Sequence, residues 1–329
     1  MLILFILQNS KDRKMSMKKT TIGGMALIEG IMMKGPKKIS IVIRKPNGEL
    51  YKEVKDLAID DTNKLKKIPF IRGVFILFEQ MILGTKALMK SADIALEELP
   101  DEEKEKQKDF VDKLFEKKFF QKIGVTDIAI YFSVVVSIVL GILLFFYIPT
   151  WSVEVFKGFS LSSFWKNMIE GIVRVIIFIL YLLFASQMKE IKRVFEYHGA
   201  EHKTIFAYEN GEELSIPNIK KYSTHHPRCG TSFLFIVIII SIIIFTISGW
   251  QSVIMRTLLR LLLLPVIIGI SYEIIRWAGK SESILARIIS YPGLWLQNIT
   301  TKEPDEKQIE VAIEALKEVV PEDRKLDEW

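Results

Sequence analysis

Residues 231–250 read TSFLFIVIIISIIIFTISGW, a run of twenty positions without a charged side chain. About 20 apolar residues suffice for a helix to cross the hydrocarbon core of a bilayer, and a terminal tryptophan favours the membrane–water interface. The segment 128–148, IAIYFSVVVSIVLGILLFFYI, is also free of charge and is bounded by Asp127 and Pro149. These two stretches predict membrane-spanning helices and decide the fold class.

Two further apolar runs bring the number of predicted spans to four. Residues 168–188 contain only Glu170 and Arg174 as charges, which can snorkel to the interface or pair one helical turn apart. Residues 253–277 contain Pro265, which predicts a kinked fourth span. With 50% hydrophobic residues and a mean hydropathy of +0.25, the chain is predicted to be a mainly α-helical integral membrane protein.

The distribution of lysine and arginine predicts the orientation of the spans. Basic residues gather before the first span, between the second and third, and after the fourth, whereas the other two connections hold few. Both termini and the connection 189–230 are therefore expected on the cytoplasmic side. We assign the net charge of +6 to contacts with the lipid bilayer, and no specific nucleic-acid partner is expected because no nucleic-acid-binding module accompanies it.

The segments outside the spans predict further domains. Residues 17–98 predict a small N-terminal α+β domain that is cytoplasmic or peripheral. In it, residues 39–44 and 50–54 alternate apolar and polar side chains around an Asn-Gly turn, which predicts a β-hairpin. Residues 70–88 are apolar on nearly every face but contain Glu79, which favours a re-entrant, interfacial or buried helix.

The glycine-rich segment 23–36 of this domain indicates tight backbone geometry. It holds four glycines and a proline within 14 residues. Its spacing does not match a phosphate-binding loop. Glu29 within it is interpreted as a buried hydrogen-bonding residue or, alternatively, as a site residue.

The rest of the chain divides into three parts. Residues 99–125 alternate acidic and basic side chains and are predicted to be a charged linker or helix. Residues 126–278 form the predicted four-span membrane domain. The cytoplasmic tail 279–329 contains a predicted amphipathic helix, expected to pack on a cytoplasmic partner, whose apolar face comprises Ile309, Ala312, Ala315, Leu316 and Val319.

Every histidine and the single cysteine lie in one stretch of 32 residues, inside the connection between the second and third spans. One cysteine excludes an intrachain disulfide and favours a reducing compartment. Imidazole and thiolate groups gathered in one place suggest a divalent transition metal, most simply zinc. The candidate metal ligands are His198, His202, His225, His226 and Cys229.

The sequence His198-Gly199-Ala200-Glu201-His202 matches the H-x-x-E-H pattern of inverted zinc metallopeptidases. On a helix the two histidines share one face, and Glu201 is placed to act as the catalytic general base. Those enzymes take a third ligand, a glutamate, from a helix many tens of residues downstream, where only Glu273 lies within a predicted span. His225, His226 and Cys229 are nearer alternatives. The competing interpretation is that the histidines order the connection through hydrogen bonds without a metal.

The chain resembles the YqhQ-like family of bacterial multi-pass membrane proteins, a domain of unknown function that is sometimes labelled a predicted metal-dependent enzyme. The resemblance implies a multi-pass protein of the bacterial cytoplasmic membrane, and it does not supply a substrate. Its carriers are the segments 23–36, 44–48, YHGAEHK at 197–203, HPRCGT at 226–231, YPGLWLQ at 291–297 and TTKEP at 300–304.

Two functions from different classes follow from these patterns. The first is a metal-dependent hydrolase in which His198 and His202 bind zinc and Glu201 activates water. The alternative is a non-catalytic assembly, chaperone or scaffold protein that binds cytoplasmic partners such as the ribosome or the insertion machinery. A transporter is disfavoured, because the two uncharged spans lack the intramembrane charges and paired broken helices that transport usually needs.

Overall fold

The computed structural model describes residues 19–57, 68–97, 135–156, 160–247, 249, 252–281 and 283–328. Within these residues, four helical segments are long and apolar enough to cross a membrane: Val135–Val155, Ser163–Ala185 (α6), Gly230–Ile247 (α9) and Val253–Lys280 (α10). A four-stranded antiparallel sheet precedes them. The predicted fold class is confirmed, and the predicted linker 99–125 lies outside the described residues.

The described residues form two compact units. Those within 1–98, 182–237 and 268–329 make the first unit, which contains the sheet, and those within 99–181 and 238–267 make the second, which contains most of the apolar helices. The first unit also contains α8 (Ile216–Lys220), α11 (Ile284–Thr300) and a 3₁₀ turn at Arg324–Asp327.

The sheet consists of two consecutive hairpins. The predicted hairpin is confirmed as β3 (Lys38–Arg44) paired with β4 (Leu50–Asp56). The glycine-rich segment forms a second hairpin that the sequence patterns did not indicate, β1 (Gly23–Leu27) paired with β2 (Gly30–Lys34). Glu29 lies in its turn at a φ of 50°, a conformation that non-glycine residues seldom adopt. Its carboxylate accepts hydrogen bonds from Arg193 and Tyr197.

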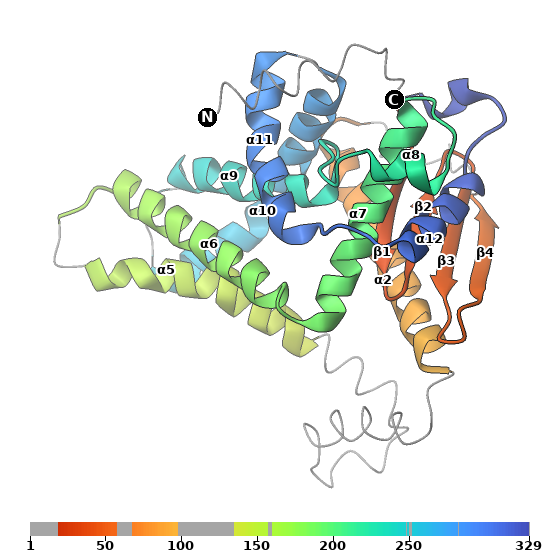
Figure 1. Ribbon diagram of the computed structural model, residues 1–329. Coiled ribbons are helices and arrows are strands. Elements are labelled where there is room, and N and C mark those ends of the chain that lie inside the picture. Colours follow the sequence, from red (N-terminus) through yellow and green to blue (C-terminus); the bar gives the residue numbers. More distant parts are fainter. Residues whose placement is uncertain are drawn as a thin grey trace, which may run out of the picture. The chain divides into compact units, whose positions relative to one another are not determined.

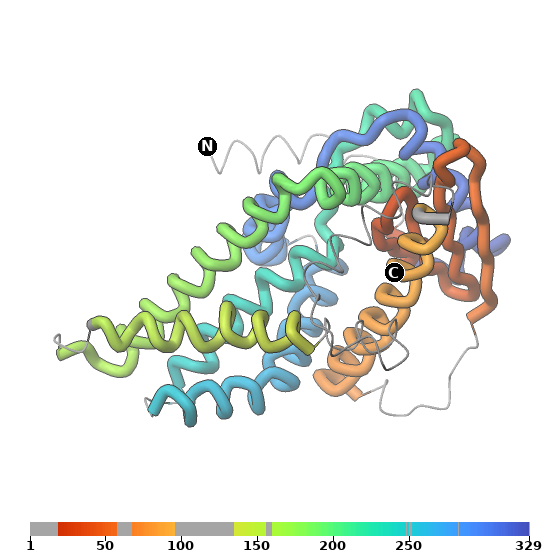
Figure 2. The backbone as a smooth tube through the Cα atoms, turned by 90° about the horizontal axis from the view of Figure 1, so that it is seen from below, coloured from red at the N-terminus to blue at the C-terminus, as the bar shows by residue number. Residues whose placement is uncertain are grey.

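Helices cover both faces of this sheet (Figures 1 and 2). On one face, Val42 of β3 joins a buried cluster with α7 (Lys189–Glu209) and α12 (Glu306–Lys317). On the other face, Ile41 and Ile43 pack against α2 (Ile71–Glu97). Because successive strand residues point to opposite faces, the apolar run of β3 supplies both cores. The histidine helix α7 thereby rests directly on the sheet.

The interpretation of the C-terminal helix as a docking surface is wrong. A capping box made by Asp305 and Gln308 starts α12. All five residues of its predicted apolar face are buried in the cluster against the protein's own sheet. The side chain of Ser40 also donates a hydrogen bond of 2.6 Å to the Ala315 carbonyl. The stripe therefore completes the fold and is not free to bind a partner.

Helix α2 has a buried face and an exposed apolar face. Large apolar side chains on the exposed face include Phe75, Phe78, Met81 and Ile82. Its first turn contacts the span α10, because a Cβ on Gly73 would lie 2.5 Å from the Tyr272 Cβ and Arg72 forms an ion pair with Glu273. These contacts support the interfacial assignment of α2, which stays a prediction.

The first span does not end at Pro149 as predicted. A π-helical segment, η2 (Leu143–Tyr147), leads into α5 (Ile148–Ser152), with the proline in its first turn. Proline has no N–H to bond the carbonyl four residues earlier. That carbonyl, of Phe145, instead accepts a hydrogen bond of 2.9 Å from Arg174 Nε, so an outside donor compensates for the missing bond.

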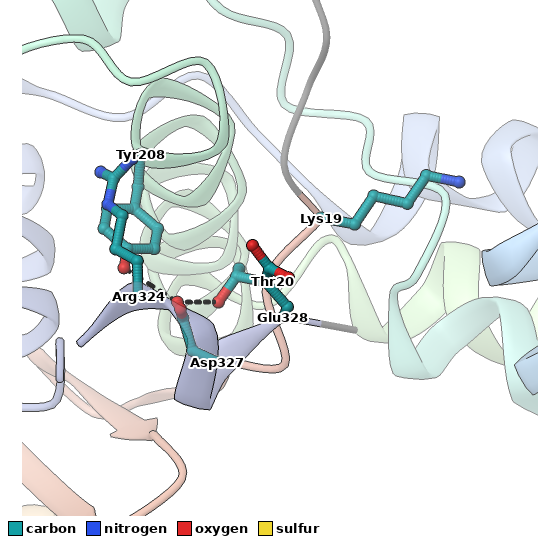
Figure 3. Close-up of a pocket in the computed structure, with 6 residues that line it drawn as sticks. All are labelled: Lys19, Thr20, Tyr208, Arg324, Asp327 and Glu328. Carbon is teal, nitrogen blue, oxygen red and sulfur yellow. Dashed lines mark hydrogen bonds between the residues drawn. The ribbon is translucent and has the colours of Figure 1, made fainter.

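The two described ends of the chain meet beside the C-terminal end of α7 (Figure 3). Thr20 forms an isolated β-bridge with Glu328, and the Thr20 and Tyr208 hydroxyls both donate to Asp327 Oδ2, at 2.7 and 2.8 Å. A small pocket there is lined by Lys19, Thr20, Tyr208, Arg324, Asp327 and Glu328. These contacts hold the residues just before β1 close to the 3₁₀ turn at Arg324–Asp327.

We expect the connection after α7 to be cytoplasmic, as the lysine and arginine distribution predicts. A cysteine introduced at the exposed Lys221 should resist a membrane-impermeant maleimide in intact cells and react after lysis, whereas one at the exposed Ser252 should react in intact cells. The native Cys229 is buried and contributes little background. Labelling of the Lys221 position in intact cells would contradict the predicted orientation.

Candidate metal centre

Helix α7 presents two imidazoles on one face. His198 and His202 are four residues apart, and their ring centroids lie 4.4 Å from each other. His198 Nδ1 donates to the Thr300 carbonyl at 2.9 Å, and His202 Nδ1 donates to the Thr224 carbonyl at 2.5 Å. A carbonyl can only accept, so each Nδ1 carries hydrogen. Both Nε2 atoms are therefore directed away from the backbone, as in histidines that bind metals.

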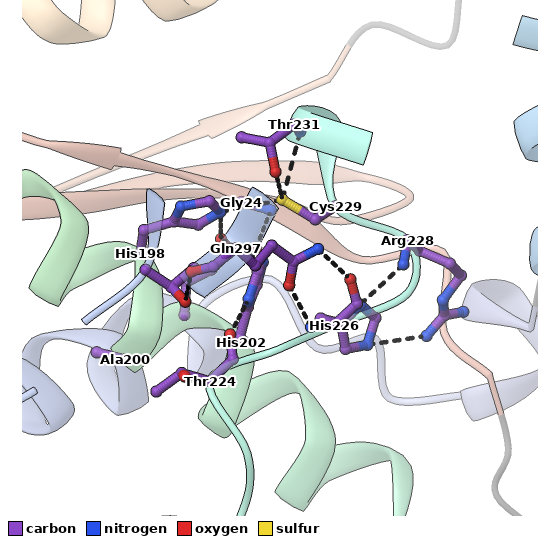
Figure 4. A network of polar contacts seen from close by, with 12 residues as sticks. Gly24, His198, Ala200, His202, Thr224, His226, Arg228, Cys229, Thr231 and Gln297 are labelled. Atoms are coloured by element: carbon purple, nitrogen blue, oxygen red, sulfur yellow. Dashed lines mark hydrogen bonds and ion pairs between the residues drawn. The ribbon is translucent and has the colours of Figure 1, made fainter. Parts of the chain in front are cut away.

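Cys229 brings a thiol to these nitrogens from the turn that precedes α9 (Figure 4). Its Sγ lies 3.2 Å from His198 Nε2 and accepts a hydrogen bond of 3.4 Å from the Thr231 N–H at the start of α9. The donor atoms of His198, His202 and Cys229 lie within 4.8 Å of one another. These three residues could hold a metal ion.

Glu201 lies beside the three donors. Its Oε1 accepts a hydrogen bond of 3.0 Å from the Gly24 N–H of β1, which fixes the carboxylate against the sheet. Its Oε2 is 4.0 Å from the Nε2 atoms of both His198 and His202. The Oε2 atom is thus next to the donor group.

The charges of His198 and Cys229 are coupled. Burial opposes the charged form of His198, but the Cys229 sulfur and Glu201 raise its pKa to about 9. Burial also opposes the Cys229 thiolate, but His198 and His202 lower the pKa of the thiol well below its usual value. His198 and Cys229 therefore each favour the charged form of the other. A divalent cation beside the sulfur would likewise favour the thiolate.

The other candidate ligands lie outside the donor group. His225 Nε2 is 3.2 Å from Asn298 Oδ1. His226 is buried 3.5 Å from Glu209, and burial together with Arg228 and His202 lowers its pKa to about 4, against the effect of Glu209. Glu273 pairs with Arg72 rather than with a histidine. Among the candidates named from the sequence, the structure brings together His198, His202, Cys229 and Glu201.

Sequence reasoning missed Gln297, which positions the cysteine turn. The fully buried amide of this α11 residue accepts a hydrogen bond of 2.7 Å from the His226 N–H and donates one of 2.9 Å to the His226 carbonyl. Gln297 thus holds both the N–H and the carbonyl of His226, three residues before Cys229. The sequence feature that could have identified Gln297 is the presence of a glutamine within the apolar run LWLQNI. Gly24 and the carbonyls of Thr224 and Thr300 were not identifiable, because their role depends on the main chain alone.

Comparisons with known proteins agree with the resemblance. The family model described as "Protein of unknown function (DUF1385)" matches residues 68–322. The "Uncharacterized protein YqhQ" of Bacillus subtilis (strain 168) is 34% identical over 306 residues, which cover 91% of this chain and 92% of that protein. No solved structure matches. The chain therefore belongs to the DUF1385 family of YqhQ-like proteins.

Proposed function

We propose that this protein is a membrane-associated, metal-dependent hydrolase whose zinc ligands are His198, His202 and Cys229 and whose general base is Glu201. The observation that carries the proposal is the orientation of both histidines, whose Nδ1 atoms donate to backbone carbonyls while their other ring nitrogens converge with the Cys229 sulfur. One thiolate and two imidazoles suit zinc. Three protein ligands also leave a fourth coordination position free, as in catalytic sites.

The residues of the site have separate tasks. A zinc ion would supply Lewis acidity and activate water for attack on a carbonyl or phosphoryl group. Glu201 Oε2, held by the bond between its other oxygen and Gly24, is placed to accept the proton of that water. Thr300 and Thr224 keep the imidazoles oriented through their carbonyls. The His198 side chain is 16% exposed, compared with 2% for His202, so access is from the His198 side.

Burial favours a second candidate function, a structural metal site in a non-catalytic membrane protein. Cys229, His202 and Glu201 are all buried. The three donors also join α7 to the turn before α9. A metal held there would fasten α7 to the start of α9 without taking part in a reaction. This alternative requires no open coordination position.

Cobalt substitution tests the site and separates the two functions. Purified full-length protein loaded with Co²⁺ should show a thiolate-to-cobalt charge-transfer band, lost in His198→Ala and Cys229→Ser. The matched control His225→Ala should keep the band, because His225 lies outside the donor group. In the hydrolase, azide should change the visible spectrum of the parent and of Glu201→Gln, since the free position remains. A spectrum insensitive to azide would favour the structural site, and a band that persists in His198→Ala would refute the ligand set.

A further inference from the structure

A charged cluster is buried among the apolar helices of the second unit. Glu170 and Arg174 of α6 and Arg260 of α10 are only 1%, 5% and 1% exposed. Arg174 Nη2 donates to Glu170 Oε1 at 2.8 Å, and Arg260 Nη1 contacts the same oxygen. The predicted Glu170–Arg174 pair therefore exists, and Arg260 joins it from another helix.

The cluster carries more positive than negative charge. Two guanidinium groups face one carboxylate, which leaves a net charge of +1 if all three are ionised. The neighbouring Arg256 has its own ion pair with Glu154, at 2.8 Å, and so does not alter this balance. The Phe245 ring lies 4.9 and 5.3 Å from the Arg260 and Arg174 Cζ atoms. Cation–π contacts of this kind offset only part of the cost of placing a cation in a membrane.

Arg174 and Glu170 are held in place by the surrounding helices. Arg174 Nε donates to the Phe145 carbonyl that Pro149 leaves without its helical partner. Thr150 Oγ1, one residue further, donates to Glu170 Oε1 at 3.0 Å. The irregular π-helical segment η2 thus supplies a fixed carbonyl and brings a hydroxyl to the cluster. Such π-bulges occur frequently at functional sites.

Two polar atoms of the cluster have no hydrogen-bond partner among the described residues. Thr150, Arg174 and Arg260 all donate to Glu170 Oε1, while its buried Oε2 accepts no hydrogen bond from the described residues. Arg260 uses Nη1 and Nη2, the latter bonding Asn167 Oδ1 at 3.2 Å, but its buried Nε donates to no acceptor. A surplus positive charge together with an unused guanidinium N–H calls for an anionic acceptor.

We propose that Arg174, Arg260 and Glu170 form a binding site for an anionic phosphate group within the membrane helices. The arginines supply charge, and Glu170 holds them in position through its Oε1. Glu170 and Arg260 each lie seven residues from the starts of α6 and α10, about 10 Å along each helix at 1.5 Å per residue. Arg174 is the middle residue of α6, so the cluster lies between the middle of these helices and one of their ends. Either a lipid headgroup or a free phosphate can supply the group.

The test measures binding to the full-length protein in detergent by native mass spectrometry, with phosphatidylglycerol, phosphatidylcholine and inorganic phosphate as probes. We expect bound phosphatidylglycerol to exceed phosphatidylcholine. Arg260→Gln should weaken that binding at least about tenfold, because it removes the surplus charge and leaves the Glu170–Arg174 pair neutral. Lys280→Gln is the matched control, since it makes the same charge change at the exposed far end of α10 and should have no effect.

Added inorganic phosphate identifies the source of the group. If it displaces the lipid and binds the parent but not Arg260→Gln, the site accepts free phosphate; if it does not compete, the site takes a lipid headgroup. Equal binding of the two lipids by the parent, without phosphate binding, would overturn the proposal, as would equal binding by the parent and a folded Arg260→Gln. If the variant does not fold, the comparison of phosphatidylglycerol with phosphatidylcholine on the parent alone tests the proposal.

Discussion

Removal of the metal is expected to lower the melting temperature of the purified protein substantially. The donor group joins the middle of α7 to the turn before α9, so a bound ion would crosslink segments that are about thirty residues apart in sequence. A ligand present at 1,000 times its dissociation constant stabilises the folded state by about 4.1 kcal/mol. One kcal/mol corresponds to about 2–4 °C for a domain of 150–250 residues. Chelation should therefore lower the midpoint by roughly 8–16 °C.

The measurement is a thermal unfolding curve with and without a strong chelator, followed by return of zinc. Cys229→Ser should already melt at the lower temperature and show no response to chelator, because it lacks the thiolate of the donor group. His225→Ala should respond like the parent, since its ring contacts Asn298 outside that group. Zinc should restore the parent, whereas magnesium, which prefers oxygen ligands, should not. A parent whose melting is indifferent to chelator would argue against a metal in either proposed function.

The sequence was sufficient for those parts of the fold that depend on local pattern. Long uncharged runs predict spans because a bilayer has a fixed thickness, and the alternation around Asn47–Gly48 predicts β3 and β4 because a tight turn needs positive φ, which Gly48 adopts at 90°. The hairpin of β1 and β2 was not predicted, because its two loop residues, Ile28 and Glu29, include no glycine and the positive φ is adopted by Glu29. Its strand β2 is also buried on both faces, so no alternation appears.

Long-range contacts were less predictable. The apolar stripe of α12 is visible in the sequence, but whether it faces a partner or the protein's own sheet depends on the tertiary fold. The spacing of His198 and His202 predicted a shared helical face, yet the choice of Cys229 over His225 and His226 is set by the turn that Gln297 holds. Likewise, Glu170 and Arg174 are neighbours by helical spacing, whereas Arg260 is 90 residues away from Glu170 in sequence.

Gly199 shows how one position serves both the fold and the candidate metal centre. An alanine is normally preferred to glycine within a helix, by about 1 kcal/mol. A Cβ at Gly199, however, would lie 2.0 Å from the Lys302 carbonyl oxygen. That segment is fixed to α7 by two hydrogen bonds, because the Lys302 N–H donates to the Phe195 carbonyl at 2.9 Å and the Thr300 carbonyl accepts from His198. The glycine thus permits the close approach that orients His198.

Gly199→Ala is therefore expected to weaken metal binding and to destabilise the protein despite its better helix propensity. Displacing the Lys302 backbone should cost about 1–3 kcal/mol or more, as overpacking usually does. Loss of the Thr300 acceptor should reduce metal affinity about 10–100-fold. Metal titration and thermal unfolding measure the two effects. Gly141→Ala is the matched control, because a Cβ there meets no atom of the described residues within 4 Å, and it should leave stability unchanged or raise it by up to about 1 kcal/mol.

Metal affinity and stability should both depend on the close approach of the Lys302 backbone to Gly199. If the Thr300 carbonyl orients His198 for a metal, metal affinity and stability should fall together in Gly199→Ala, and chelator should shift its melting less than it shifts that of the parent. A variant that is less stable but binds metal as tightly as the parent would show that the carbonyl is dispensable to the site. That result would leave Gly199 with a packing role alone, since the atoms nearest to an added Cβ belong to Lys302 and Thr224.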